Sequence, residues 1–237
     1  MRRWWNSPSP VRGLADLDVR ARMTPVVVAA VLIGATWGFA ADRLAARWPA
    51  HDDGTVRGTD WRTLAVVVTG AAGLGLLAER FADQPGPLPY LGALVLALTL
   101  LFATDLDQRL LPDLITLPIV AFALVGFVTG VGPFVRTPLD LAWAAVAATA
   151  VPGALYLLSI PFGAGAIGLG DLKLLFGMGL LVGALRLAAM VVVGAVAAAV
   201  GIVALLLVRR ITLKSYVPYG PFLIIGAIWA VTVSRGL

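Results

Sequence analysis

The chain has 237 residues, of which 60% are hydrophobic and only 13% are charged, and its mean hydropathy is +0.94. Soluble domains carry nearer a quarter charged residues, so this composition excludes an ordinary soluble domain and predicts a membrane protein. The formal charge of +5 does not indicate a nucleic-acid partner, because the cations are mostly arginines in short loops, where they usually set membrane orientation.

Eight apolar stretches are long enough, or nearly so, to cross a bilayer as helices, which takes about 20 residues each. They cover residues 24–41, 61–78, 88–104, 114–131, 138–160, 171–184, 187–208 and 217–234. Strands are not expected, because no window alternates polar and apolar residues as a membrane barrel does. The sequence therefore predicts an all-α, polytopic membrane protein with about eight transmembrane helices, in one domain over residues 24–237.

The polar segments bear on orientation. Residues 1–23 predict a polar, flexible tail, and residues 42–60 form the longest polar connection. If the loops 105–113 and 161–170 face the cytoplasm, most loop arginines lie there too, as the positive-inside rule requires. The arginines of the tail favour the opposite orientation. We follow the loops and expect 105–113 and 161–170 to face the cytoplasm.

Two residue types that often carry chemistry are missing or nearly so. Cysteine is absent, which excludes disulfides and thiolate zinc sites. His51 is the single histidine, and no G-x-S-x-G motif occurs, so neither a histidine-ligated metal nor a Ser-His-Asp triad is expected. We expect no metal and no cofactor. Any chemistry has to come from carboxylates.

Two aspartates, Asp105 and Asp171, each adjoin a membrane-length apolar stretch. An ionisable group near the bilayer costs about 2.5–3.5 kcal/mol at a helix centre, so it points to a function. Two predicted spans separate the pair, which places both on the same side of the membrane. Carboxylates that meet can share a proton and activate a water. The helix dipole favours the anion at Asp171, which begins a helix, and the shared proton on Asp105, which ends one.

Glycines and prolines stand close to both aspartates or open the last span. Gly168 and Gly170 precede the second aspartate and either let another backbone approach closely or form an ordinary glycine-rich helix start. Pro218, Gly220 and Pro221 either leave backbone groups free of helical bonding beside a cavity or begin a helix with proline in its first turn. Both alternatives stay open for each segment.

Other charged residues near the first two segments have simpler explanations. Asp113, after Pro112, is expected to cap the helix that follows. Asp107 is expected to be a solvated loop residue, with substrate contact as the alternative. Lys173 is expected to pair with a lipid phosphate or with Asp171.

Three segments resemble the type IV prepilin peptidase family, the GxGD-type aspartyl peptidases of bacterial pilus and type II secretion systems. Residues 105–118 read DLDQRLLPDLITLP and resemble the block around the family's first aspartate. Residues 168–174 read GLGDLKL and resemble the second block, and residues 218–222 read PYGPF and resemble the segment before the last helix. The resemblance covers about residues 88–234.

This resemblance implies an enzyme of the bacterial inner membrane that removes leader peptides from prepilin-like proteins, cutting after glycine on the cytoplasmic side. Asp105 and Asp171 would be its catalytic pair. The residues that would bind substrate or shape the site are Gly168, Gly170, Lys173, Asp107, Pro112, Asp113, Pro218, Gly220 and Pro221. Many members also carry a cysteine-containing domain linked to methylation of the new N-terminus. Because this chain lacks cysteine, we expect neither a zinc site nor methyltransferase activity.

Two other functions fit the same features. A transporter or ion pathway also places carboxylates among helices, although the internal repeats common in transporters are not found in this sequence. An inactive relative that serves only in pilus assembly is the other alternative.

Overall fold

The computed structural model describes residues 10–50, 54–162, 167–207 and 219–233, and over these residues it is all-helical, without β-strands. The helices are α1 (Pro10–Ala45), α2 (Trp61–Arg80), α3 (Leu88–Gln108), α4 (Asp113–Thr129), α5 (Pro138–Ser159), α6 (Leu169–Val182), α7 (Ala184–Leu207) and α8 (Gly220–Thr232). A short 3-10 helix, η1 (Ile160–Phe162), follows α5. The predicted all-α fold class is confirmed.

Five helices, α1 from Pro25 onward, α2, α3, α5 and α7, are long and apolar enough to cross a membrane. Helices α4 and α8 are shorter and apolar, and α6 has 14 residues. The protein is therefore a polytopic helical membrane protein, while eight as the number of spans stays a prediction. Helix α1 begins within the segment 1–23 predicted as a tail, of which residues 1–9 lie outside the described residues.

Local sequence determines where several helices begin and end. Asp60 and Thr63 form a capping box at the start of α2, and Thr137 and Asp140 form one at the start of α5. In such a box each side chain accepts a hydrogen bond from a backbone N–H that the helix leaves unpaired. Helix α3 ends at Arg109, whose φ of 56° is left-handed and stops the helical hydrogen bonding.

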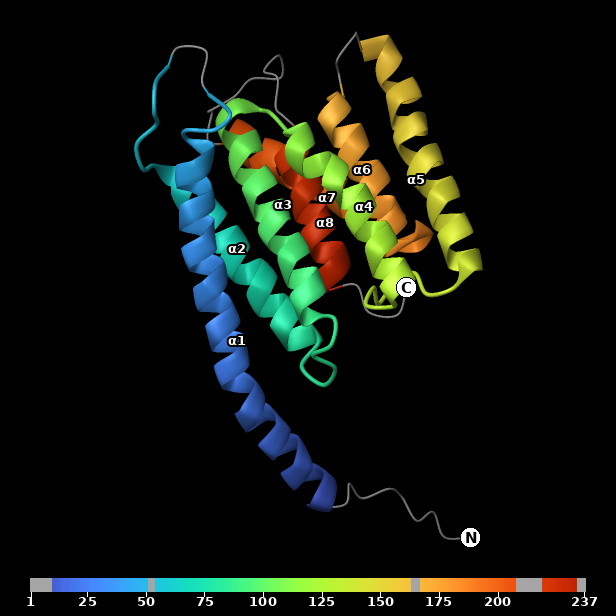
Figure 1. Cartoon of the computed structure of the whole chain (residues 1–237). Helices are drawn as coiled ribbons and strands as arrows, with labels where there is room; N and C mark the ends of the chain where they lie inside the picture. The colour runs from blue at the N-terminus through green and yellow to red at the C-terminus, as the bar shows by residue number, and fades with distance from the viewer. Residues whose placement is uncertain (1–9, 51–53, 163–166, 208–218, 234–237) are drawn as a thin grey trace.

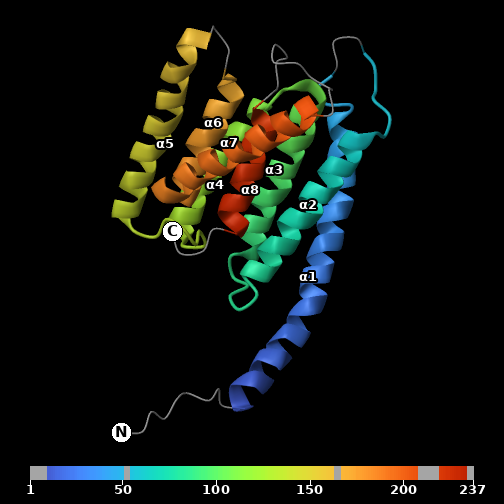
Figure 2. The same cartoon turned by 180° about the vertical axis from the view of Figure 1, so that it is seen from behind.

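Two groups of helices meet through α8 (Figure 1). Helices α1, α2 and α3 pack on one another, and α6 packs on both α4 and α5. Helix α8 contacts α2 and α3 on one side and α6 and α7 on the other, so it joins the two groups. Seen from behind, α7 lies across α8, and α1 projects beyond the rest of the bundle at its N-terminal end (Figure 2).

The core lies around α8, which packs against both α3 and α6. Its largest fully buried side chains on these helices are Leu91, Leu94, Leu98, Leu101, Leu174, Leu175, Met178, Leu223 and Ile224. Their burial holds the three helices in fixed positions, because close-packed side chains resist displacement. The C-terminal end of α3 and the N-terminal ends of α6 and α8 then lie at the same end of the bundle (Figure 1).

Candidate active site

Asp105 and Asp171 are brought together from two different helices. Asp105 lies on the last turn of α3 and Asp171 on the first turn of α6. Both are buried, with 4% and 8% of their surface exposed, and their charges are close enough to interact. One cleft of about 540 Å³ is lined by both residues. The fold thus supplies two buried carboxylates in a single cleft.

Each of these carboxylates keeps one unpaired oxygen. Oδ2 of Asp105 and Oδ1 of Asp171 are buried and have no hydrogen-bond partner among the described residues. The backbone of Gly168 lies beside the carboxylate of Asp171. Because buried polar atoms are almost always hydrogen-bonded, two exceptions in one cleft call for a functional explanation.

The start of α8 contacts the first aspartate. A Cβ on Gly220 would lie 2.4 Å from Oδ2 of Asp105, so the carboxyl group leaves room for no side chain there. Pro221 stands in the first turn of α8, which agrees with the prediction of a helix that begins with proline in its first turn. Tyr219, just before α8, is close enough to interact with the charge of Asp171. Pro218 lies outside the described residues.

Gly170 allows the turn between α3 and α4 to approach α6. A Cβ on Gly170 would lie 2.7 Å from Cβ of Leu111 and 3.3 Å from its carbonyl oxygen. Gly168 has a φ of −67°, which any residue adopts, and a Cβ there would lie 3.3 Å from Oδ2 of Asp171. Close approach, one of the two explanations left open, is therefore what the structure shows at Gly170.

A model of the type IV leader peptidase family matches residues 92–207, which contain both aspartates. The chain belongs to this family. Comparisons with curated proteins and with solved structures give no match. Family membership makes the protein a peptidase, and the membrane helices place it in a bilayer. The third resembling segment, residues 218–222, follows the matched region.

In this leader peptidase, an ion pair crosses the cleft where we expected other contacts. Asp113 is the first residue of α4 rather than its N-cap, which is the extended residue Pro112, so the predicted cap is wrong. Lys173 Nζ donates to both carboxylate oxygens of Asp113, each at 2.7 Å. The alternative pairing of Lys173 with Asp171 is therefore wrong. This exposed ion pair links the N-terminal ends of α4 and α6.

Asp107 is not a solvated loop residue. Helix α3 continues to Gln108, and the side chain of Asp107 is only 2% exposed. Its Oδ1 accepts hydrogen bonds from Nε of Arg57 at 2.6 Å and from Nη1 of Arg62 at 3.1 Å. The prediction failed because the connection between α1 and α2 lies against the end of α3, a contact that sequence spacing does not reveal.

Arg57 joins Asp107 to two further carboxylates. It pairs with Asp42, which is fully buried at the end of α1, and with Asp60 at 2.7 Å. Asp42 also accepts a hydrogen bond from the hydroxyl of Thr63 at 2.8 Å. Burial disfavours the charge of Arg57, but hydrogen bonds to Asp42 and Asp107 outweigh it and raise the pKa of Arg57. We call Asp42, Arg57, Asp60, Thr63 and Asp107 the Arg57 cluster.

The Arg57 cluster was missed by sequence reasoning, although one signal was present. Asp42 directly follows the apolar stretch 24–41, just as Asp105 follows 88–104. A carboxylate in that position is a candidate of the same kind as Asp105. Its ion pairs with Arg43 and Arg57 distinguish it from a catalytic candidate.

Asp105 also lines a second cleft. It measures about 440 Å³ and is lined by Trp61, Arg62, Asp107 and Arg109 as well as Asp105. The first aspartate thus lines two clefts, and Arg109 lines both of them. Among the described residues, no group of three or more His, Cys, Asp or Glu side chains is arranged to hold a metal ion.

Proposed function

We propose that this leader peptidase is an intramembrane aspartyl endopeptidase that removes leader peptides from type IV prepilin-like proteins. The observation that carries the proposal is the meeting of Asp105 and Asp171 in one cleft, each buried and each with an unpartnered oxygen among the described residues. Paired carboxylates of this kind hydrolyse peptide bonds through an activated water.

The chemistry follows from the two helix ends. One carboxylate removes a proton from a water, whose oxygen bonds to the scissile carbonyl carbon, while the protonated partner donates to the carbonyl oxygen. When the C–N bond breaks, a proton passes to the leaving amine. The N-terminal end of α6 favours the anion on Asp171, which makes it the base, and leaves Asp105 as the acid.

The proposed substrate is a protein with a basic leader followed by an apolar helix, cut after glycine at the cytoplasmic face of the bacterial inner membrane. Such a helix lies in the bilayer while its junction with the leader reaches the cleft. Arginines in the connections and in the adjoining helix ends support this orientation, because five of them lie at the end of the bundle that carries the site. They are Arg43, Arg47, Arg57, Arg62 and Arg109.

Cleavage of a prepilin encoded in the same genome tests the proposal. The prepilin is co-expressed with the wild type, Asp105→Ala, Asp171→Ala and the control Asp83→Ala, an exposed aspartate in the connection between α2 and α3. We expect intact mass to show cleavage after glycine by the wild type and the control only. Cleavage by either of the other variants would refute the two-aspartate mechanism. A new N-terminus without a methyl group is also expected, since the chain has no cysteine.

The absence of native cysteine makes orientation directly measurable. Gly58 and Gly86 stand in connections at opposite ends of the bundle, and a Cβ at either meets nothing within 4 Å. We expect a membrane-impermeant maleimide to label Gly86→Cys in intact cells and to label Gly58→Cys only after lysis. The reverse pattern would place the site outside the cytoplasm.

A further inference from the structure

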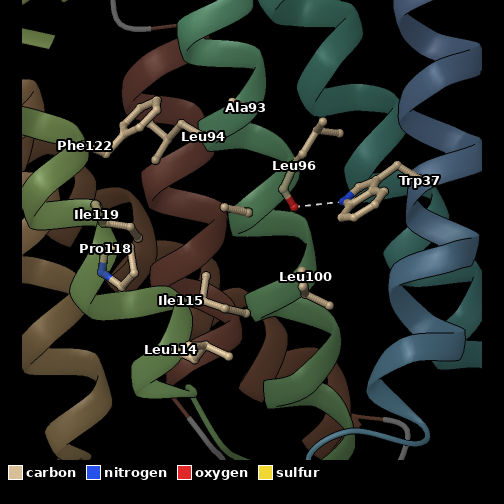
Figure 3. A pocket seen from close by; sticks show the side chains of 11 residues that line it. Trp37, Ala93, Leu94, Leu96, Leu100, Leu114, Ile115, Pro118, Ile119 and Phe122 are labelled. Carbon is tan, nitrogen blue, oxygen red and sulfur yellow. Dashed lines mark hydrogen bonds between the residues drawn. The ribbon is translucent and has the colours of Figure 1, made fainter. Parts of the chain in front are cut away.

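An apolar groove of about 410 Å³ runs between α3 and α4, with α1 along its far side (Figure 3). We call it the α3–α4 groove. Its lining residues are Trp37, Ala93, Leu94, Leu96, Ala97, Leu100, Leu114, Ile115, Pro118, Ile119 and Phe122. Its volume lies within the range of about 300–1,000 Å³ that is typical of ligand pockets.

One end of the α3–α4 groove adjoins the catalytic cleft. Leu114 lines the groove, and its neighbour Asp113 lines the cleft. On α3, Leu100 lines the groove and Asp105 lines the cleft, five residues or about 7.5 Å further along the helix. Between the groove and the aspartates lies the connection between α3 and α4, residues 109–112, which itself lines the cleft.

The dimensions of the α3–α4 groove suit a helix. The lining runs from Ala93 to Leu100 on α3 and from Leu114 to Phe122 on α4, which is about 10–12 Å, or two helical turns. Ala93 and Ala97 lie one turn apart in this lining. Small residues at that spacing let a second helix approach closely within a bilayer.

The polar groups of the α3–α4 groove favour a polypeptide over a lipid chain. Nε1 of Trp37 donates to the carbonyl oxygen of Leu96 at 2.9 Å, so this donor is already satisfied and needs no partner from a bound molecule (Figure 3). At the cleft end, Pro118 has no N–H, so the carbonyl of Leu114 lacks the usual helical donor four residues on. A helix begins with unpaired N–H groups, which an acyl chain does not have.

We propose that the α3–α4 groove binds the apolar helix of the leader-peptide substrate, with the N-terminal end of that helix at the cleft. This inference rests on the proposed function and adds to it the place where the enzyme holds its substrate. The unpaired N–H groups at the start of the substrate helix face the carbonyl of Leu114. The junction with the leader then lies beside Asp105 and Asp171.

A groove-filling variant tests this placement. Ala97→Phe fills the α3–α4 groove, and Ala72→Phe is its matched control, because Ala72 lines a similar apolar groove of about 300 Å³ between α2 and α8. Two substrates are compared in detergent: the full prepilin, and a peptide with the leader and only the first few residues after it. We expect Ala97→Phe to lower kcat/KM for the full prepilin about 10-fold or more and to leave the peptide unchanged. Ala72→Phe should cleave both like the wild type.

Photo-crosslinking supplies a second measurement that does not depend on the phenylalanine variant folding. Benzoylphenylalanine at Ala93, an exposed position of the groove, should crosslink to the prepilin in the Asp105→Asn background, and the same group at Ala72 should not. If the wild type cleaves the prepilin but Ala97→Phe cleaves it equally well, or if Ala93 crosslinks only to lipid, the groove assignment is overturned and the peptidase stands. If the wild type cleaves neither substrate, the proposed function falls as well.

Discussion

Two sets of buried carboxylates lie at the same end of the bundle, and they differ in whether arginine side chains pair with them. In the Arg57 cluster, Asp42 and Asp107 have almost no exposed surface, and both are paired with arginine. Asp105 and Asp171 are buried as well, yet each keeps an oxygen without a partner among the described residues. Asp105 and Asp107 are separated by one residue on the same helix.

The difference teaches how a membrane protein separates stabilising from reactive carboxylates. A buried charge is tolerated when an arginine and hydrogen bonds satisfy it, and removing its partner is then strongly destabilising. Two buried carboxylates that line one cleft and keep unpaired oxygens are instead suited to acid–base chemistry, in which one is protonated and the other is not. The Arg57 cluster therefore holds the end of α3 in place, and we propose that the aspartate pair serves catalysis.

The largest expected effect comes from the pair itself. Asp105→Asn and Asp171→Asn should each reduce the cleavage rate about 10²–10⁴-fold or more, because each removes an acid–base group. Neither should lower the unfolding temperature in detergent, since no ion pair is lost. An asparagine variant that unfolds early would contradict the comparison, because it would show that the pair stabilises the fold.

The opposite pattern is expected at Arg57. Arg57→Ala removes the cation shared by Asp42 and Asp107 but leaves Arg43 beside the first and Arg62 beside the second, so it should lower the free energy of unfolding by about 1.5–3 kcal/mol. Arg57→Lys keeps the positive charge but not the planar guanidinium group, so it should restore part of the lost free energy of unfolding. Unfolding in mixed micelles measures both, with the exposed Arg47→Ala as the control. Unchanged stability in Arg57→Ala would show that the cluster does not hold this end of the bundle.

Gly220 tests how closely the geometry of the pair is set. A methyl group from Gly220→Ala would displace the carboxyl group of Asp105 or the start of α8, and a shift of about 1 Å can cost about 10²-fold in rate. Gly153→Ala is the matched control, because a Cβ there meets nothing within 4 Å. Cleavage assays should show a lower rate for Gly220→Ala and a rate like that of the wild type for Gly153→Ala. Equal rates would mean that the contact with Asp105 is not needed for catalysis.

The smallest effect belongs to the ion pair across the cleft. Asp113 and Lys173 are well exposed, at 57% and 37% of their side-chain surface, so their coupling should be only about 0.2–1 kcal/mol. A double-mutant cycle with Asp113→Asn and Lys173→Met measures it. A coupling as large as the effect of Arg57→Ala would remove the contrast between exposed and buried pairs.

Much of the fold follows from the apolar stretches alone. Each of the eight predicted stretches overlaps a helix, and the ends of α2, α3 and α5 agree with the prediction to within a few residues. This success has a simple cause: in a bilayer every backbone polar group needs an internal partner, so a long apolar stretch has to be helical. The surroundings of polar residues near the helix ends, such as Asp107 and Asp113, were predicted less well because their contacts are with residues distant in sequence.

By itself, the sequence determined the class of protein, the approximate helices, the family and the two aspartates to examine, because hydropathy and short motifs are local properties. Only the tertiary structure decided which carboxylates are paired. Asp42 and Asp105 each follow an apolar stretch and look alike in sequence. Folding brings Arg57 to the first and Asp171 and Gly220 to the second. The charge that lies beside a carboxylate is set by packing between helices, and that packing is what separates the two.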